Sequence, residues 1–349
     1  MLNYLYNFTG SLCDEIFLTP ARIYHTFKPA KPVDLEAYET QMDDYVEKGF
    51  VDNPIDFFEL PTHQPSFEIR EHHPYQQDGE FQLISYTSDY IPKNSFIRDR
   101  FLSYHENRTG YLVRWHHTQQ KYTKTIVCLH GYMLGEPSQA EKMFKIQTLF
   151  SAGLDVVLFI SPFHWKRNSG KLYDRGMFLQ ADDVVMTAEC FGQAMHDLRI
   201  SLNILRQLGS EKIGLIGASL GGYLAALYVS LCAIPYFAAL MVPAVDFSHP
   251  FGTETAKFSC SIHQTCKTKM AKIWTMHSPL HFVPKIPTTN MLFVAFKGDR
   301  VCPFTQVQSL AQQWQCNRVH FLDGGHWVNL GFKSRGRVWY QFLKDMEFI

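Results

Sequence analysis

The sequence lacks the features that mark several special classes of protein. It has no excess of charge, because 33 lysines and arginines balance 33 aspartates and glutamates. A chain without a basic surplus has no general attraction to nucleic acid or to an anionic membrane. Internal repeats and low-complexity stretches are also missing. Since 46% of the 349 residues are hydrophobic, we expect a globular protein with a large apolar core.

Paired cysteines of the C-x-x-C type are missing as well, although the chain holds 8 cysteines. A disulfide framework is not expected in a chain of this size. Cys128 and Cys232 lie in apolar runs, which is typical of reduced thiols in a core. The spacing of Cys260, His263 and Cys266 matches no common zinc site, so we expect no metal.

The N-terminal stretch MLNYLYNFTGSLCDE has neither the basic part nor the clean apolar part of a secretory signal, so we expect a cytoplasmic protein. Residues 223–245 carry no charge and are long enough to span a bilayer. Pro235 and Pro243 interrupt that segment. A helix, a break near Pro235 and a buried strand over 236–242 explain it better, because a strand buried on both faces also loses its alternation.

Short apolar runs alternate with helical patterns after about residue 110. The best helical pattern covers 182–208, where apolar residues recur at steps of four and three before Gly209 ends it. Such alternation predicts an α/β fold, with a mostly parallel sheet covered by helices on both faces. The predicted strands of this part are 125–129, 154–160, 212–216, 237–242, 291–296 and 318–322.

Residues 1–110 lack this rhythm. We predict one helix over 34–48 and strands over 81–87 and 111–116. The region is expected to be an N-terminal extension whose helices and leading strands pack on a main domain of residues 111–349. Residues 247–285, between two predicted strands, are expected to form a small cap-like insertion. Its aromatic side chains fit either an apolar pocket or ordinary packing.

Ligands of parallel sheets bind where the strands end, so the loops after the strands carry the candidate chemistry. Ser219 follows the apolar run 213–216 and precedes a stretch of small and helix-forming residues. A serine on such a tight turn needs small neighbours, which Gly217 and Gly221 provide. The N–H of Leu220, at the start of the helix, would face the oxyanion that forms when Ser219 attacks a carbonyl. One such donor contributes about 3 kcal/mol to the transition state.

A serine hydroxyl needs a base, and His326 on a glycine-rich loop is the candidate. Asp299 is the candidate acid that orients the imidazole, and the chain order Ser, Asp, His suits this turn. Asp246, after another predicted strand, is a rival acid, whereas Asp323 is too close to His326 in sequence to be favoured. Each residue also has a plain alternative role: Ser219 as a helix N-cap, Asp299 in a surface turn and His326 as a loop residue.

Further site residues come from the other loops. The second oxyanion donor is expected to be the backbone N–H of Tyr132, with Met133 as the weaker alternative. Contacts to the substrate are expected from His130, Gly131, His164 and Trp327. His164 can equally well be interpreted as a loop residue without a role in the site.

Four motifs together resemble the α/β-hydrolase fold superfamily of serine hydrolases. They are LHGY at 129–132, GASLGG at 217–222, KGDRVCP at 297–303 and DGGHW at 323–327. The loop SPFHWKRNSG and the helix AMHDLRISLNILRQLG are also similar to one branch of α/β-hydrolase domain proteins. The resemblance covers about residues 110–349. It implies a Ser219–His326–Asp299 triad, oxyanion donors at Tyr132 and Leu220, and no metal or organic cofactor.

The expected function is hydrolysis of a carboxylic ester of a small molecule through an acylated Ser219. The same groups can cut a thioester, an amide or a short peptide. Two alternatives stay open: a non-catalytic member of the fold that binds a ligand or partner, and a lipase or thioesterase that works at a lipid surface. The sequence predicts no oligomeric state.

Overall fold

The computed structural model describes residues 2–27, 34–76, 78–119, 123–170, 177–180, 183–247, 264–328 and 332–349. The strands are β1 (Phe67–Tyr75), β2 (Gly79–Thr87), β3 (Thr109–His117), β4 (Thr123–Leu129), β5 (Asp155–Phe159), β6 (Ser210–Ala218), β7 (Phe237–Met241), β8 (Met291–Phe296) and β9 (Val319–Leu322). The helices are α1 (Leu2–Phe27), α2 (Leu35–Glu47), α3 (Arg98–Leu102), α4 (Pro137–Phe144), α5 (Ile146–Ser151), α6 (Val184–Gln207), α7 (Leu220–Leu231), α8 (Gln264–Thr275), α9 (Phe304–Gln313) and α10 (Phe332–Asp345).

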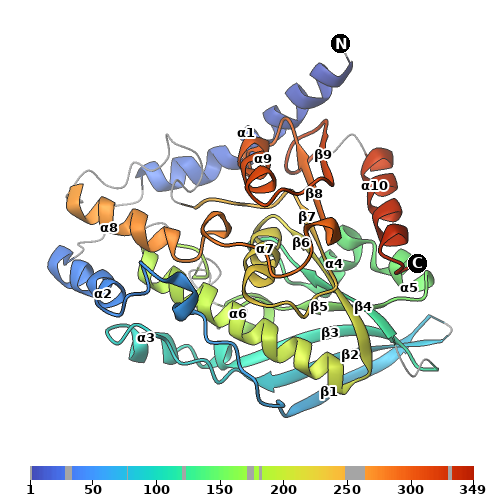
Figure 1. Ribbon diagram of the computed structural model, residues 1–349, viewed down its shortest axis with the longest axis horizontal. Coiled ribbons are helices and arrows are strands. Elements are labelled where there is room, and N and C mark those ends of the chain that lie inside the picture. Colours follow the sequence, from blue (N-terminus) through green and yellow to red (C-terminus); the bar gives the residue numbers. More distant parts are fainter. Residues whose placement is uncertain are drawn as a thin grey trace.

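The strands within these ranges form one sheet in the order β1-β2-β3-β5-β4-β6-β7-β8-β9 (Figure 1). β1, β2, β3 and β5 pair antiparallel, and all pairs from β5 to β9 are parallel. In the centre, Leu129 at the end of β4 lies opposite Gly217 near the end of β6. The loops after these strands therefore meet at one edge of the sheet. The predicted α/β fold with a mostly parallel sheet is confirmed.

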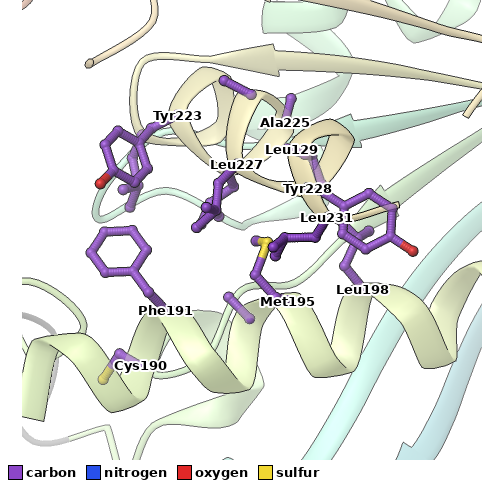
Figure 2. Packing of buried hydrophobic residues seen from close by; sticks show 14 of the residues in the cluster. Leu129, Cys190, Phe191, Met195, Leu198, Tyr223, Ala225, Leu227, Tyr228 and Leu231 are labelled. Atoms are coloured by element: carbon purple, nitrogen blue, oxygen red, sulfur yellow. The ribbon is translucent and has the colours of Figure 1, made fainter. Parts of the chain in front are cut away.

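Helices cover both faces of the sheet, and the strand residues alternate between the two sides. Val127 and Leu129 face a core formed with α2, α6, α7, α8 and α9, whereas Ile126 and Cys128 face a second core formed with α4, α5 and α10. In the first core, Phe191 of α6 packs on Tyr223 of α7, with ring centroids 5.0 Å apart (Figure 2). This packing fixes α7, the helix that begins directly after Ser219.

The elements that were predicted by residue range appear with ends shifted by two residues or fewer, and α1 and β1 are among the elements for which no range was predicted. The uncharged segment 223–245 forms the greater part of α7, a break near Pro235 and β7, and most of its side chains are buried. No helix in the described ranges combines the length and the apolar character needed to cross a membrane. Cys128 and Cys232 are buried free thiols, as predicted.

α1 and β1 were not predicted because their apolar residues do not mark a buried face. Nearly every side chain of β1 is exposed, and the strand lies at the edge of the sheet. Its sequence therefore lacks the alternation of apolar and polar residues that indicates a strand with one buried face. α1 turns Gly10, Asp14 and Leu18 inward and leaves large apolar side chains in solvent, the reverse of a typical surface helix. The division into an extension (1–110) and a main domain (111–349) stays a prediction, although β1 and β2 continue the same sheet.

A buried ion pair joins the loop after β5 to α6 and gives a stability prediction. Arg167 Nη2 donates to Asp197 Oδ2 at 2.6 Å, and neither side chain is exposed. We expect Arg167→Met to lower the free energy of unfolding by about 3–5 kcal/mol, because Asp197 is left as an uncompensated buried charge. Urea denaturation measures this loss. The control Arg100→Met breaks the more exposed pair with Asp183 and should cost about 0–1 kcal/mol. Equal losses in the two variants would contradict the assignment.

Candidate active site

Ser219 occupies a strained turn between β6 and α7. Its backbone has φ 56° and ψ −118°, a region that residues with a side chain rarely adopt. The turn is also tightly packed: a Cβ on Gly217 would lie 2.0 Å from the carbonyl oxygen of Gly221, and a Cβ on Gly221 would lie 1.9 Å from that of Leu129. Glycine is therefore required at both positions. The strain holds the Ser219 side chain at the end of the strand, beside the loops after β8 and β9.

The three predicted catalytic side chains form one continuous chain of hydrogen bonds. His326 Nε2 lies 3.1 Å from Ser219 Oγ, and His326 Nδ1 lies 2.8 Å from Asp299 Oδ2. Asp299 follows β8, and its other oxygen, Oδ1, accepts from the backbone N–H groups of Val301 (2.8 Å) and Cys302 (2.7 Å). The aspartate is thus locked on one side while its second oxygen faces the imidazole.

The loop after β4 lies against the serine turn. A Cβ on Gly131 would lie 3.6 Å from both Ser219 Cβ and the carbonyl oxygen of Ala218, an ordinary van der Waals distance, so Gly131 lies directly beside the turn. Leu220 is the first residue of α7, where backbone N–H groups precede the first helical hydrogen bond. The N–H of Met133, in contrast, donates to His164 Nε2 at 3.1 Å. The N–H of Met133 is therefore engaged by His164, and Tyr132 stays the predicted second oxyanion donor.

Comparison with known proteins identifies the family of this chain. Residues 120–329 match the model of a family described as serine hydrolase (FSH1). The chain belongs to this serine hydrolase family. A curated relative of the serine hydrolase, the uncharacterized protein MT2702 of Mycobacterium tuberculosis, is 30% identical over 291 residues, which cover 81% of this chain and 68% of that protein.

Solved structures of α/β-hydrolase esterases share the fold. Acetyl xylan esterase 1 from Thermoanaerobacterium sp. superimposes with a TM-score of 0.60 at 15% identity, over 87% of this chain and 94% of its own. The acetyl xylan esterase from Paenibacillus sp. R4 gives a TM-score of 0.57 at 13% identity, over 90% and 96%. At such identities the likeness shows the fold alone. The resemblance to the α/β-hydrolase superfamily seen in the sequence is confirmed.

The two histidines expected to contact substrate are both buried in this serine hydrolase, with their ring nitrogens engaged by backbone. His130 Nδ1 donates to the carbonyl of Gly131 (2.8 Å), and its Nε2 accepts from Ser161 N (3.2 Å). His164 Nδ1 donates to the carbonyl of Pro162 (2.8 Å) and accepts from Met133 at Nε2. Burial lowers the pKa of His130 to about 4 and that of His164 to about 3, so both rings are neutral at pH 7. We interpret them as supports of the loop after β4, which carries Gly131 and Tyr132.

Trp327 lies at the surface beside the triad. Its side chain is 52% exposed, and its ring contacts both His326 and Phe17, with centroid distances of 5.1 and 5.7 Å. This position suits the predicted contact with substrate. Of the rival acids, Asp323 accepts instead from Asn7 Nδ2 at 2.9 Å, and the carboxylate that accepts from His326 Nδ1 is that of Asp299.

Part of the predicted cap-like insertion of the serine hydrolase, residues 248–263, lies outside the described residues and includes Phe251, Phe258, Cys260 and His263. Trp274 and Phe282, which follow that part, are buried in the core beside α6 and α7. These two aromatic residues therefore serve ordinary packing.

Two residues of the site were missed in the sequence. Cys302 Sγ lies 3.9 Å from Ser219 Oγ and is buried. Its motif, KGDRVCP, was noted in the sequence, but only Asp299 within it was given a role. Asp14 of α1 accepts hydrogen bonds from the backbone of the His326 loop. Nothing in the N-terminal sequence could have signalled a contact across about 300 positions.

Burial by itself lowers the pKa of His326, whereas the hydrogen bond to Asp299 and the charge of that carboxylate raise it, and the net shift is upward. Burial also raises the pKa of Cys302, so its sulfur is a neutral thiol at pH 7. Asp299 is therefore the charge that stabilises the imidazolium. The base form of His326 predominates only above this raised pKa.

This shift predicts the pH dependence of the serine hydrolase. Because the neutral imidazole must accept the proton of Ser219, activity should rise with pH through the raised pKa of His326, with a midpoint above the ordinary histidine value of about 6.5. The measurement is kcat/KM as a function of pH with an ester that does not ionise. A midpoint below the ordinary value would contradict the assigned contact with Asp299.

Proposed function

We propose that the protein hydrolyses carboxylic esters through an acyl-enzyme at Ser219. The observation that carries this proposal is the hydrogen-bond chain Asp299–His326–Ser219 on a strained strand-to-helix turn. A serine that served only as a helix cap would need neither the strain nor the histidine, and Ser219 makes no capping hydrogen bond with its side chain.

The reaction follows from the geometry in two halves. Ser219 Oγ attacks the ester carbonyl while His326 Nε2 takes its proton, and the N–H groups of Leu220 and Tyr132 stabilise the oxyanion. The intermediate collapses when His326 returns the proton to the departing alcohol, which leaves the acyl group on Ser219. Water then attacks the acyl carbon and gives its proton to His326. Collapse of the second intermediate releases the acid and restores the Ser219 hydroxyl.

Esters are the substrate class best supported. The structures with the same fold named above are esterases, and the family is described as serine hydrolase. Trp327 and the backbone of Gly131, which lie beside the triad, are the proposed substrate contacts, and His130 and His164 fix the loop after β4. Thioesters remain compatible with the same groups, since the attacked atom is again an acyl carbon.

The test is the time course of p-nitrophenyl ester hydrolysis at high enzyme concentration. An acyl-enzyme predicts a burst of p-nitrophenol, equal to the enzyme present, before slower turnover. A series of acyl chain lengths would then define the pocket. A folded protein that binds these esters without releasing p-nitrophenol would support the non-catalytic alternative instead.

Esters held in a lipid surface are a second candidate substrate, favoured by the outer face of α1. Five large apolar side chains on this helix are 50–61% exposed: Leu5, Phe8, Leu12, Ile16 and Phe17. Phe17 touches Trp327, and the Trp327 ring contacts His326, so the apolar face extends to the triad. Helices that lie in a membrane surface present such a face to the lipid. Their apolar side chains would bring the site to an insoluble ester.

This candidate predicts faster hydrolysis of an ester in micelles than of the same ester as monomers. Phe8→Ser combined with Ile16→Ser should remove that increase and leave the rate on monomeric ester unchanged. The control pair Ile91→Ser and Phe96→Ser replaces apolar residues that are also exposed but lie in the segment between β2 and α3. Equal rates on micelles and monomers in the wild type would rule against a lipid-surface enzyme.

A further inference from the structure

The inner face of α1 contacts the two loops that carry Asp299 and His326. We call residues 297–303 the acid loop and residues 323–328 the base loop. Asn7 Nδ2 donates to Asp323 Oδ1 (2.9 Å), and Asn7 Oδ1 accepts from the N–H of Gly324 (3.0 Å), both in the base loop. Ser11 Oγ donates to the carbonyl of Gly298 in the acid loop (2.8 Å). One face of the N-terminal helix α1, blue in Figure 1, thus binds both loops.

Glycines allow the helix to approach these loops at backbone distance. A Cβ on Gly10 would lie 2.1 Å from the backbone nitrogen of Gly325 in the base loop. A Cβ on Gly298 in the acid loop would lie 2.4 Å from the carbonyl oxygen of Asn7. Both contacts leave no room for a side chain, so the helix and the loops are fitted to each other.

Asp14 joins the two loops directly. Its Oδ2 accepts from the backbone N–H of Arg300 in the acid loop (3.0 Å) and from that of His326 in the base loop (2.8 Å). Its Oδ1 accepts from the N–H of Trp327 (3.1 Å). The side chain is fully buried. A buried carboxylate that binds three backbone donors fixes their positions more strongly than a neutral acceptor would.

We propose that Asp14 is a positioning residue for the reaction: it holds the base loop against the acid loop, so that His326 stays in contact with both Asp299 and Ser219. The inner face of α1 then positions the loops of the active site and does more than cover the fold. Asp14 acts through the backbone of His326 and does not touch the substrate. The inference rests on the proposed function for the role of His326 as base.

The pH profile separates positioning from a purely structural role. The groups that face His326 are Asp299 and Cys302 from the acid loop, Asp14 from α1 and Ser219 from the turn. Removal of the Asp14 charge disfavours the imidazolium, and a looser contact between His326 and Asp299 does the same. Both effects lower the pKa of His326 and move the acid limb of activity to lower pH.

The experiment measures the rate of labelling by a fluorophosphonate as a function of pH, in the full chain. Asp14→Asn keeps the shape of the side chain but places an amide where three N–H donors point. We expect the plateau rate to fall about ten- to a hundredfold, as for a base displaced by about 1 Å, and the acid midpoint to shift to lower pH. NMR titration of the His326 ring measures the same pKa without any chemistry.

The matched control is Asp44→Asn in α2. Asp44 is also buried and accepts from Ser95 N, Ser95 Oγ and Lys48 Nζ, but no triad residue is among these donors. This variant should lose stability and keep the labelling rate and midpoint of the wild type. Asn7→Ala, which removes two bonds to the base loop, should change rate and midpoint in the same direction as Asp14→Asn, and carries the test if Asp14→Asn does not fold.

The outcomes are distinct. Folded Asp14→Asn or Asn7→Ala with an unchanged rate and an unchanged His326 pKa overturns the inference. If the wild type is not labelled at Ser219, the proposed function fails instead, and the NMR titration alone then decides whether Asp14 positions His326.

Discussion

Replacement of Ser219 by alanine is expected to lower kcat for ester hydrolysis by at least about 10⁴-fold, because the nucleophile of the acyl-enzyme is removed. The fold should persist. Ser219 Oγ contacts His326 Nε2 and Cys302 Sγ but makes no capping bond to α7, so the substitution leaves the helix and the turn intact. Steady-state kinetics measures the loss of kcat, and circular dichroism on the same sample shows whether the variant is folded.

Cys302 provides the control for this variant. Its thiol lies 3.9 Å from Ser219 Oγ and near the same histidine, so it is the nearest substitute nucleophile. The double variant Ser219→Ala, Cys302→Ala should be no less active than Ser219→Ala alone, because the Cys302 thiol is buried and neutral. Wild-type turnover in the single variant would mean that Ser219 is not the nucleophile.

Asp299→Asn is expected to lower kcat by about 10⁴-fold while leaving the acid loop in place. The carbonyl oxygen of the new amide can still accept from the N–H groups of Val301 and Cys302, which bind Oδ1 now. The NH₂ group then faces His326 Nδ1, which must become an acceptor. The ring proton moves to Nε2, and the ring can no longer take the proton of Ser219.

The controls for this variant are the two rival acids. Asp323→Asn alters a contact with Asn7, and Asp246→Asn alters a residue after β7. Each should retain kcat within about tenfold of the wild type, well short of the loss expected for a triad acid. A loss of about 10⁴-fold in Asp246→Asn, with Asp299→Asn near wild type, would reassign the acid.

The sheet and the positions of the proposed catalytic residues could be predicted because local patterns encode them. Apolar runs such as 291–296 have the length and flanks of buried strands, and the structure places β8 there without a shift. Loops after parallel strands must meet at one edge of the sheet. That rule brought Ser219, Asp299 and His326 together before any distance was known.

The role of each loop side chain could not be predicted in the same way. His130 and His164 lie on the correct loops, yet their rings turn inward and bond to backbone. A sequence states which loop carries a histidine but not the direction of its ring. The role of Asp14 was not predicted for a second reason. Its partners lie about 300 positions away, and they are backbone N–H groups, which carry no signal of residue type.

The most direct test of the account is to treat the native protein with a fluorophosphonate and map the modified residue by mass spectrometry. We predict that the label is on Ser219, that Ser219→Ala abolishes it, and that His326→Ala reduces its rate sharply. A label on any other residue, or no label on the folded wild type, would contradict an activated Ser219 nucleophile.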